Sequence, residues 1–343
     1  MGAYIPSSFK PAWWLPSPHC QTLWPFLLRR IDAPPRRHEI YSTPDRDVLE
    51  LEWCGDRGPL VLILHGLTGS ADSHYVKGLQ WALHKQGWRS VVLNFRGCGR
   101  TPNRTALCYH SGETGDLNLV YRMIRQREPE TPLAVVGYSL GGNVLLKWLG
   151  EHGAELDLFA ACAVSVPLLL DKCATAMDRG LARIYRNHLL SELKRYLRAK
   201  ISYLERLQMR SEAKKLKALG HLESIRSFWK YDDRVIAQLY PFHDVHDYYA
   251  KCSSRQFLPH IEIPTLIIQA RDDPFTTPEV IPTAEETAPS VLLEITPRGG
   301  HVGFVEGPLP GKAKYWLERR IPEFLATQFI WRSSDIPGHR SQR

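Results

Sequence analysis

A serine between glycines is the residue of this chain best placed for nucleophilic chemistry. The run Gly137-Tyr138-Ser139-Leu140-Gly141 follows an apolar stretch at 133–136 and precedes 143–149, whose apolar spacing is helical. This pattern predicts a sharp strand-to-helix turn centred on Ser139, because glycines permit the close backbone approach that such a turn needs. The hydroxyl would then lie at a helix N-terminus, where exposed N–H groups favour negative charge. The five-residue pattern also arises by chance, so partners elsewhere must decide its meaning.

Two later loops contribute an acid and a base. The apolar run 265–269 leads into Asp272 and Asp273, and the run 291–295 leads into a glycine-rich loop that contains His301. Serine, acid and histidine therefore follow successive predicted strands. A serine hydroxyl is a weak nucleophile at neutral pH, so His301 would accept its proton and later return it to the leaving alcohol. The carboxylate would hold the imidazole tautomer and stabilise the imidazolium.

The sequence leaves two candidates for the acid. Asp273 is favoured over Asp272 because Pro274 fixes the turn directly after it, which leaves Asp272 as a helper or a turn cap. A tetrahedral oxyanion also needs two fixed donors. The backbone N–H groups of Leu140 and Leu67 are the expected pair, and His65 is expected to be a structural hydrogen-bonding residue in the loop that contains Leu67.

Apolar strands alternate with helical patterns through most of the chain. Residues 48–53 predict an antiparallel strand with Glu50 and Glu52 on a solvated face. The other predicted strands are 60–64, 89–95, 133–136, 159–164, 265–269 and 291–295, and the predicted helices between the early strands are 74–86 and 116–127. This rhythm predicts an α/β fold with a mostly parallel, doubly wound sheet, whose reactive residues lie at the carboxyl ends of the strands.

Four segments are expected along the chain. Residues 1–44 are rich in proline and tryptophan and should form an arm packed on the body, which spans 45–330. The alternation stops at about 168–256, where apolar residues recur every three to five positions, so this segment predicts an inserted helical cap. Residues 331–343 are expected to form a C-terminal tail.

Composition excludes several functional classes. The net charge of +8 arises between Asp178 and Lys230, where 14 Lys or Arg face 5 Asp or Glu. This basic segment lacks aromatics suited to stacking on bases, so no nucleic-acid partner is expected, whereas peripheral contact with anionic membrane surfaces remains open. No transmembrane segment or signal peptide is expected. Seven scattered cysteines without a C-x-x-C pair argue against a disulfide framework or zinc site and favour a cytoplasmic, reducing location.

Several motifs resemble the YheT-like branch of the α/β-hydrolase superfamily. They include His19-Cys20-Gln21-Thr22-Leu23, Tyr109-His110-Ser111-Gly112-Glu113-Thr114, the serine turn and Gly299-Gly300-His301-Val302-Gly303-Phe304. The resemblance spans about 9–326 and implies an α/β-hydrolase fold and carboxylic-ester hydrolysis. It also extends to yeast medium-chain ethyl ester synthase/esterases, and it supports Asp273 as the acid.

The leading hypothesis is therefore a serine esterase for short to medium acyl chains that uses an acyl-enzyme and needs no cofactor or metal. One alternative is an acyltransferase or ester synthase, in which an alcohol accepts the acyl group. Another is a catalytically silent lipid-binding or partner-binding protein on the same fold.

Overall fold

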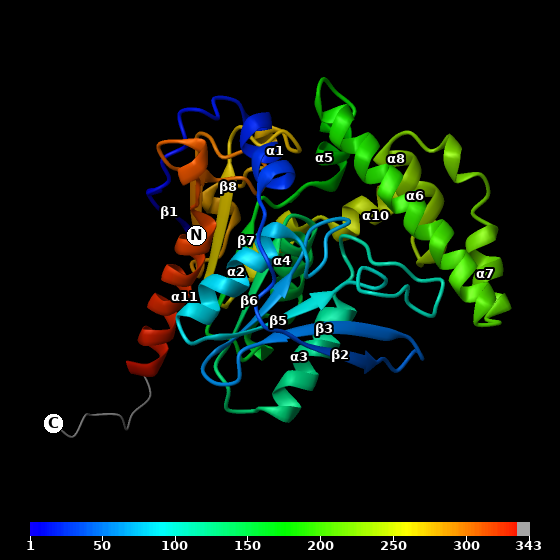
Figure 1. Cartoon of the computed structure of the whole chain (residues 1–343), viewed down its shortest axis with the longest axis horizontal. Coiled ribbons are helices and arrows are strands. Elements are labelled where there is room, and N and C mark those ends of the chain that lie inside the picture. Colours follow the sequence, from blue (N-terminus) through cyan, green and yellow to red (C-terminus); the bar gives the residue numbers. More distant parts are fainter. Residues whose placement is uncertain (335–343) are drawn as a thin grey trace.

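A computed structural model describes residues 1–334 of the 343-residue chain. Within that range a central sheet has nine strands in the order β1-β9-β8-β7-β6-β4-β5-β3-β2 (Figure 1). Their bounds are β1 Ala3–Tyr4, β2 Arg37–Ser42, β3 Val48–Cys54, β4 Leu60–Leu64, β5 Arg89–Asn94, β6 Leu133–Tyr138, β7 Ala160–Val164, β8 Thr265–Ala270 and β9 Val291–Thr296. Strands β4 to β9 run parallel, whereas β3 is antiparallel to β5 and β2. The predicted mostly parallel α/β sheet is confirmed.

Helices cover both faces of the sheet. The main ones are α2 His74–Lys85, α3 Gly115–Arg127, α4 Leu140–His152 and α11 Leu317–Ser334. One apolar cluster joins α2 and α11 to one face of the sheet, and a second joins α3 and α4 to the other. Every residue of β4, β6, β7 and β8 is buried, as expected of parallel strands covered on both sides. These strands were predictable because their sequences are continuous apolar runs.

The prediction of a solvated face on β3 is wrong. Glu50 and Glu52 each expose only 5 % of their surface. Glu50 accepts hydrogen bonds from the backbone N–H groups of Arg100 and Thr101, at 2.8 and 3.0 Å, and Glu52 pairs with His38 and Arg100. The strand β2 and the loop after β5 cover this face, and their polar groups replace water around the carboxylates, except at Glu52 Oε2, which has no hydrogen-bond partner among the described residues.

The region between β7 and β8 is helical. Its helices are α5 Leu170–Ala176, α6 Ala182–Arg206, α7 Arg210–Lys217, α8 Phe228–Tyr231, α9 Ala237–Leu239 and α10 Val245–Cys252, with a π-helical segment at Asp232–Ile236. Figure 1 shows α6 and α7 to one side of the sheet. Apolar residues of these helices form a cluster of their own, to which the loop at 106–108 also contributes. We propose that this cluster is the core of the predicted cap.

The segment predicted as an arm contributes secondary structure to the body. It forms β1, the helix α1 Pro18–Leu28 and the edge strand β2. Phe9 packs against Phe304 and Trp316, with ring centroids 5.3 and 5.4 Å away. Two short strands, β10 Val305–Glu306 and β11 Lys314–Tyr315, pair beside this segment. At the other end, α11 continues to Ser334, so residues 331–334 of the predicted tail are helical, and 335–343 lie outside the described residues.

Candidate active site

Ser139 occupies the turn between β6 and α4. Its backbone has φ 51° and ψ −119°, a region that residues with a side chain rarely adopt and that costs about 1–3 kcal/mol. The Ser139 N–H donates to the carbonyl of Val164 on β7 at 2.8 Å, which fixes the turn against the neighbouring strand. The surrounding structure therefore holds a strained backbone that presents the hydroxyl at the first turn of α4.

Two glycines allow the turn to close. A Cβ on Gly137 would lie 2.5 Å from the carbonyl oxygen of Gly141, and one on Gly141 would lie 2.5 Å from the carbonyl oxygen of His65. Both contacts are with backbone atoms, which cannot rotate away as a side chain can. The helix α4 thus approaches β6 and β4 more closely than any larger residue would permit.

The structure brings Ser139, His301 and Asp273 into one hydrogen-bonded chain. His301 Nε2 lies 2.9 Å from Ser139 Oγ, and His301 Nδ1 lies 2.8 Å from Asp273 Oδ2. The Asp273 side chain is fully buried and that of His301 is 10 % exposed. Asp272 does not contact the imidazole, because its Oδ1 accepts a hydrogen bond from the Gly300 N–H at 3.0 Å. The structure thus brings together the three side chains that were expected as nucleophile, base and acid, whereas Asp272 contacts the backbone of the histidine loop.

The amides of Leu67 and Leu140 lie on the two segments that flank Ser139. A Cβ on Gly66 would lie 3.2 Å from the Cβ of Ser139, so the loop after β4 passes directly beside the serine. Across residues 1–334, neither amide donates a hydrogen bond to a protein atom. Neighbouring amides of this loop are already engaged, since Gly66 N–H donates to Tyr75 and Thr68 N–H to Tyr109. The two predicted donors are therefore free to bind an oxyanion.

Comparisons with known proteins identify the family of this chain. Residues 59–308 match the family described as the alpha/beta hydrolase fold. The chain belongs to the α/β-hydrolase family. Within that family it is 39 % identical over 315 residues to the Escherichia coli protein named "Putative esterase YheT", with 90 % of each chain covered. It is 29 % identical over 341 residues to the mouse phospholipase ABHD3, covering 94 % of this chain and 79 % of the relative.

A solved hydrolase structure shares the fold. The esterase PF2001 of Pyrococcus furiosus superposes with a TM-score of 0.55, at 17 % identity and with 96 % of this chain and 98 % of that chain covered. At this identity the likeness concerns architecture alone. The names of the two sequence relatives, an esterase and a phospholipase, support hydrolase chemistry in general.

Further residues of the hydrolase hold the histidine loop in place. The His301 N–H donates to Thr22 Oγ1 at 2.9 Å, and the Val302 N–H donates to Ser165 Oγ at 3.0 Å. Gln21 accepts from the Val305 N–H at 2.7 Å and donates to the Val305 carbonyl at 3.1 Å. In the sequence, Gln21 and Thr22 stand out only as part of the motif His19-Cys20-Gln21-Thr22-Leu23. No local pattern could have paired them with a loop about 280 residues later.

Two aromatic side chains differ in their relation to the chemistry. His65 is fully buried, and this burial lowers its pKa to about 4, so the ring is neutral. Its Nε2 accepts from the Phe95 N–H, so Nδ1 carries the proton and donates to the Gly66 carbonyl. This agrees with the predicted structural role of His65.

Phe275 stacks on His301 with ring centroids 4.0 Å apart and an interplanar angle of 9°. This stacking limits how far the imidazole can tilt.

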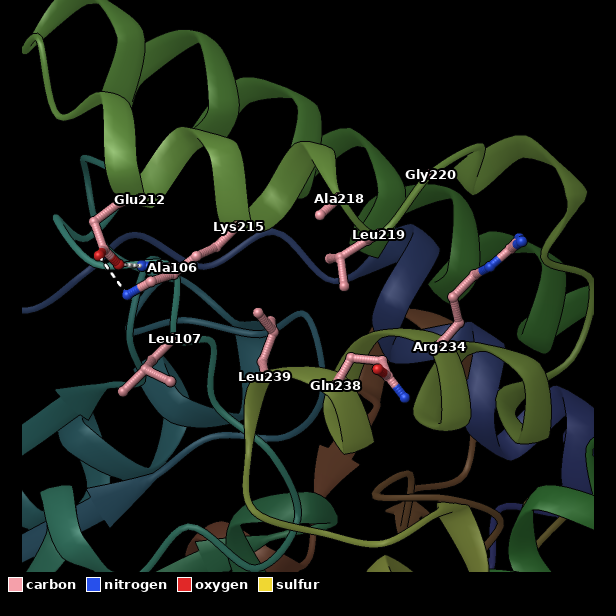
Figure 2. A pocket seen from close by; sticks show the side chains of 10 residues that line it. All are labelled: Ala106, Leu107, Glu212, Lys215, Ala218, Leu219, Gly220, Arg234, Gln238 and Leu239. Atoms are coloured by element: carbon pink, nitrogen blue, oxygen red, sulfur yellow. Dashed lines mark hydrogen bonds and ion pairs between the residues drawn. The ribbon is translucent and has the colours of Figure 1, made fainter.

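A separate cavity of about 720 Å³ lies between α7, the π-helical segment and the loop at Ala106 (Figure 2). In Figure 2, Glu212 reaches down from α7 and accepts a hydrogen bond from the Ala106 N–H at 2.7 Å. The cavity lining includes none of Ser139, Asp273 and His301.

Among residues 1–334 no three His, Cys, Asp or Glu side chains are grouped to hold a metal ion. Within the same range no helix is both long and apolar enough to cross a membrane.

Proposed function

We propose that this chain is a serine esterase that cleaves carboxylic esters of short to medium acyl chains through an acyl-enzyme. The observation that carries the proposal is the continuous chain from Ser139 Oγ through His301 to Asp273, with both hydrogen bonds below 3.0 Å. A nucleophile, a base and an orienting acid in contact are what acyl transfer requires. The names of the sequence relatives, an esterase and a phospholipase, support the same class.

The reaction begins when Ser139 Oγ attacks the ester carbonyl carbon and His301 Nε2 takes the hydroxyl proton. The oxyanion that forms accepts hydrogen bonds from the Leu67 and Leu140 N–H groups, each contributing on the order of 3 kcal/mol in the transition state. Collapse of this intermediate breaks the ester C–O bond, and the imidazolium protonates the leaving alcohol. Water then attacks the acyl-enzyme by the same steps, releasing the acid and free Ser139.

The acyl group would lie against apolar residues on the cap side of the triad. Leu67 and Phe275 are partly buried and pack against the cluster formed by the cap helices. Both side chains are close to the chemistry, since Leu67 carries an oxyanion donor and Phe275 stacks on His301. An apolar wall at this position favours acyl chains over charged substituents.

The test compares Ser139→Ala with Ser191→Ala, which removes an exposed hydroxyl from α6. The wild-type chain should hydrolyse p-nitrophenyl esters across a series of acyl lengths and react covalently with a fluorophosphonate. Ser139→Ala should lose both turnover and labelling, whereas Ser191→Ala should keep them. Wild-type turnover in Ser139→Ala would refute the mechanism, and a wild-type chain that neither turns over any ester nor takes the label would refute the function.

A further inference from the structure

Large apolar side chains gather on the surface where α1 meets the start of α6. Phe26, Leu27 and Leu28 end α1, while Leu181 and Ile184 lie at the start of α6, and each exposes 55–64 % of its surface. Phe26 contacts His188 of α6 with ring centroids 5.7 Å apart, so the two groups are neighbours. Figure 1 shows α1 and the beginning of α6 at the same end of the molecule. We call these five residues the α1–α6 apolar surface.

The helix α1 presents its side chains in an unusual way. It buries Gln21 and Pro25 and turns three large apolar residues toward solvent. Burial of Gln21 is explained by its two hydrogen bonds to Val305, whereas Phe26, Leu27 and Leu28 each leave more than half of their surface exposed. Exposing a group of large apolar side chains to water is unfavourable in free energy, and such a group marks an interaction surface.

The charges around this surface are positive. Residues 18–30 and 182–191 contain no Asp or Glu. Arg30, Arg179 and Arg183 are exposed, and none has a carboxylate partner among residues 1–334. Of the acids closest in sequence, Asp178 is paired with Arg186 at 2.6 Å, and Asp32 is exposed two residues after Arg30. Apolar side chains flanked by unpaired arginines match an anionic lipid surface. The apolar side chains would insert among the acyl chains, and the arginines would bind the anionic headgroups.

The surface also borders the triad. Ile184 is followed by Tyr185, whose ring lies 5.1 Å from that of Phe275, and Phe275 stacks on His301. Tyr185 is tied to α1 as well, because its hydroxyl lies 3.0 Å from His19 Nδ1. We propose that the α1–α6 apolar surface docks on an anionic lipid surface and so presents the triad to esters at the edge of that surface. The docking is independent of catalysis, while its use on lipid esters rests on the proposed function.

The experiment measures cosedimentation of the full chain with phosphatidylcholine vesicles, with and without phosphatidylglycerol. Wild type should bind the phosphatidylglycerol vesicles more tightly than those of phosphatidylcholine alone. The double variant Leu27→Glu/Ile184→Glu, which we call the patch variant, should bind them about tenfold or more weakly than wild type does. The matched control is Ile40→Glu with Leu207→Glu, which changes two exposed apolar residues on β2 and at the far end of α6. It should bind as wild type does. Arg179→Gln with Arg183→Gln should remove the preference for phosphatidylglycerol.

Several results would overturn the docking. Equal vesicle binding by wild type, patch variant and control would do so, as would no binding by wild type. If light scattering shows a dimer that only the patch variant dissociates, and vesicles are not bound, the surface belongs to a second copy of the chain. Turnover of a soluble p-nitrophenyl ester separates the two proposals, because the patch variant should keep it. Vesicle binding by a chain without turnover would refute the esterase and leave the docking intact.

Discussion

The Oγ1 of Thr22 accepts a hydrogen bond from the backbone N–H of His301 at 2.9 Å and donates one to the carbonyl of Pro18 at 2.8 Å. A residue near the start of the chain thereby fixes the backbone of the histidine that we propose as the base. Together with Gln21, it makes α1 part of the support of the site. The imidazole is thus held from both sides, by Asp273 at Nδ1 and by α1 at its backbone.

Thr22→Val should lower kcat by about tenfold and leave KM nearly unchanged, because the His301 N–H would lose its acceptor at a cost of about 1–3 kcal/mol. Steady-state kinetics on a soluble ester measures both constants, and circular dichroism checks the fold. Thr22→Ser keeps the hydroxyl and should recover the wild-type kcat. A Thr22→Val enzyme as fast as wild type would show that this hydrogen bond does not position the base.

The two neighbouring aspartates should respond very differently to the same change. Asp273→Asn should lower kcat by about 10⁴-fold, since the amide can no longer hold the imidazole in the required tautomer or stabilise the imidazolium. Asp272→Asn should cost less than about tenfold, because its amide oxygen can still accept from the Gly300 N–H. The measurement is kcat on one ester for both variants. Equal losses, or a larger loss for Asp272→Asn, would contradict the assignment of the acid.

Gly141→Ala should destabilise the fold by about 3 kcal/mol or more, because the added methyl group would lie 2.5 and 2.8 Å from two backbone oxygens, those of His65 and Leu64. Gly311→Ala is the matched control, with no atom within 4 Å of the new methyl group, and should change stability by no more than about 0.5 kcal/mol. Urea unfolding compares the two with wild type. A Gly141→Ala protein of wild-type stability would mean that α4 can move away from β4.

The stability of the fold should depend on pH through His74. Burial lowers the pKa of this histidine to about 4, with Arg29 and Lys77 adding to the effect, and its Nδ1 has no partner among the described residues. Its ordinary pKa is roughly 6.5, so between the two values the unfolded chain binds the proton and the folded chain does not. Stability is therefore present above that window and is lost as the pH falls through it.

The variant His74→Leu isolates this contribution. Between about pH 7 and about pH 5, wild type should lose about 2 kcal/mol more of its free energy of unfolding than His74→Leu does. Urea unfolding at the two pH values gives the difference, and His221→Leu, which changes an exposed histidine, should follow wild type. Parallel losses in wild type and His74→Leu would show that His74 is protonated equally in both states.

Sequence reasoning succeeded where the signal was local. The strand β4 was predicted with its observed bounds because five apolar residues stand between turn residues, and the backbone of Ser139 followed from the glycines around it. It failed for Glu50 and Glu52, whose burial depends on polar groups about 14 to 51 residues away along the chain. It likewise could not assign roles to Gln21 and Thr22. Alternation reports the face of a strand only when nothing else packs on that face.

The contact between Gln21 and Val305 joins positions 284 residues apart. During synthesis, helix α1 therefore cannot form its contacts with the histidine loop until that loop has emerged from the ribosome. Ser139 is made long before that, yet it can contact His301 only after this late closure. With His301 as the base that we propose, a nascent chain arrested before the loop would lack that base, so the fold delays reactivity until the histidine loop has been made.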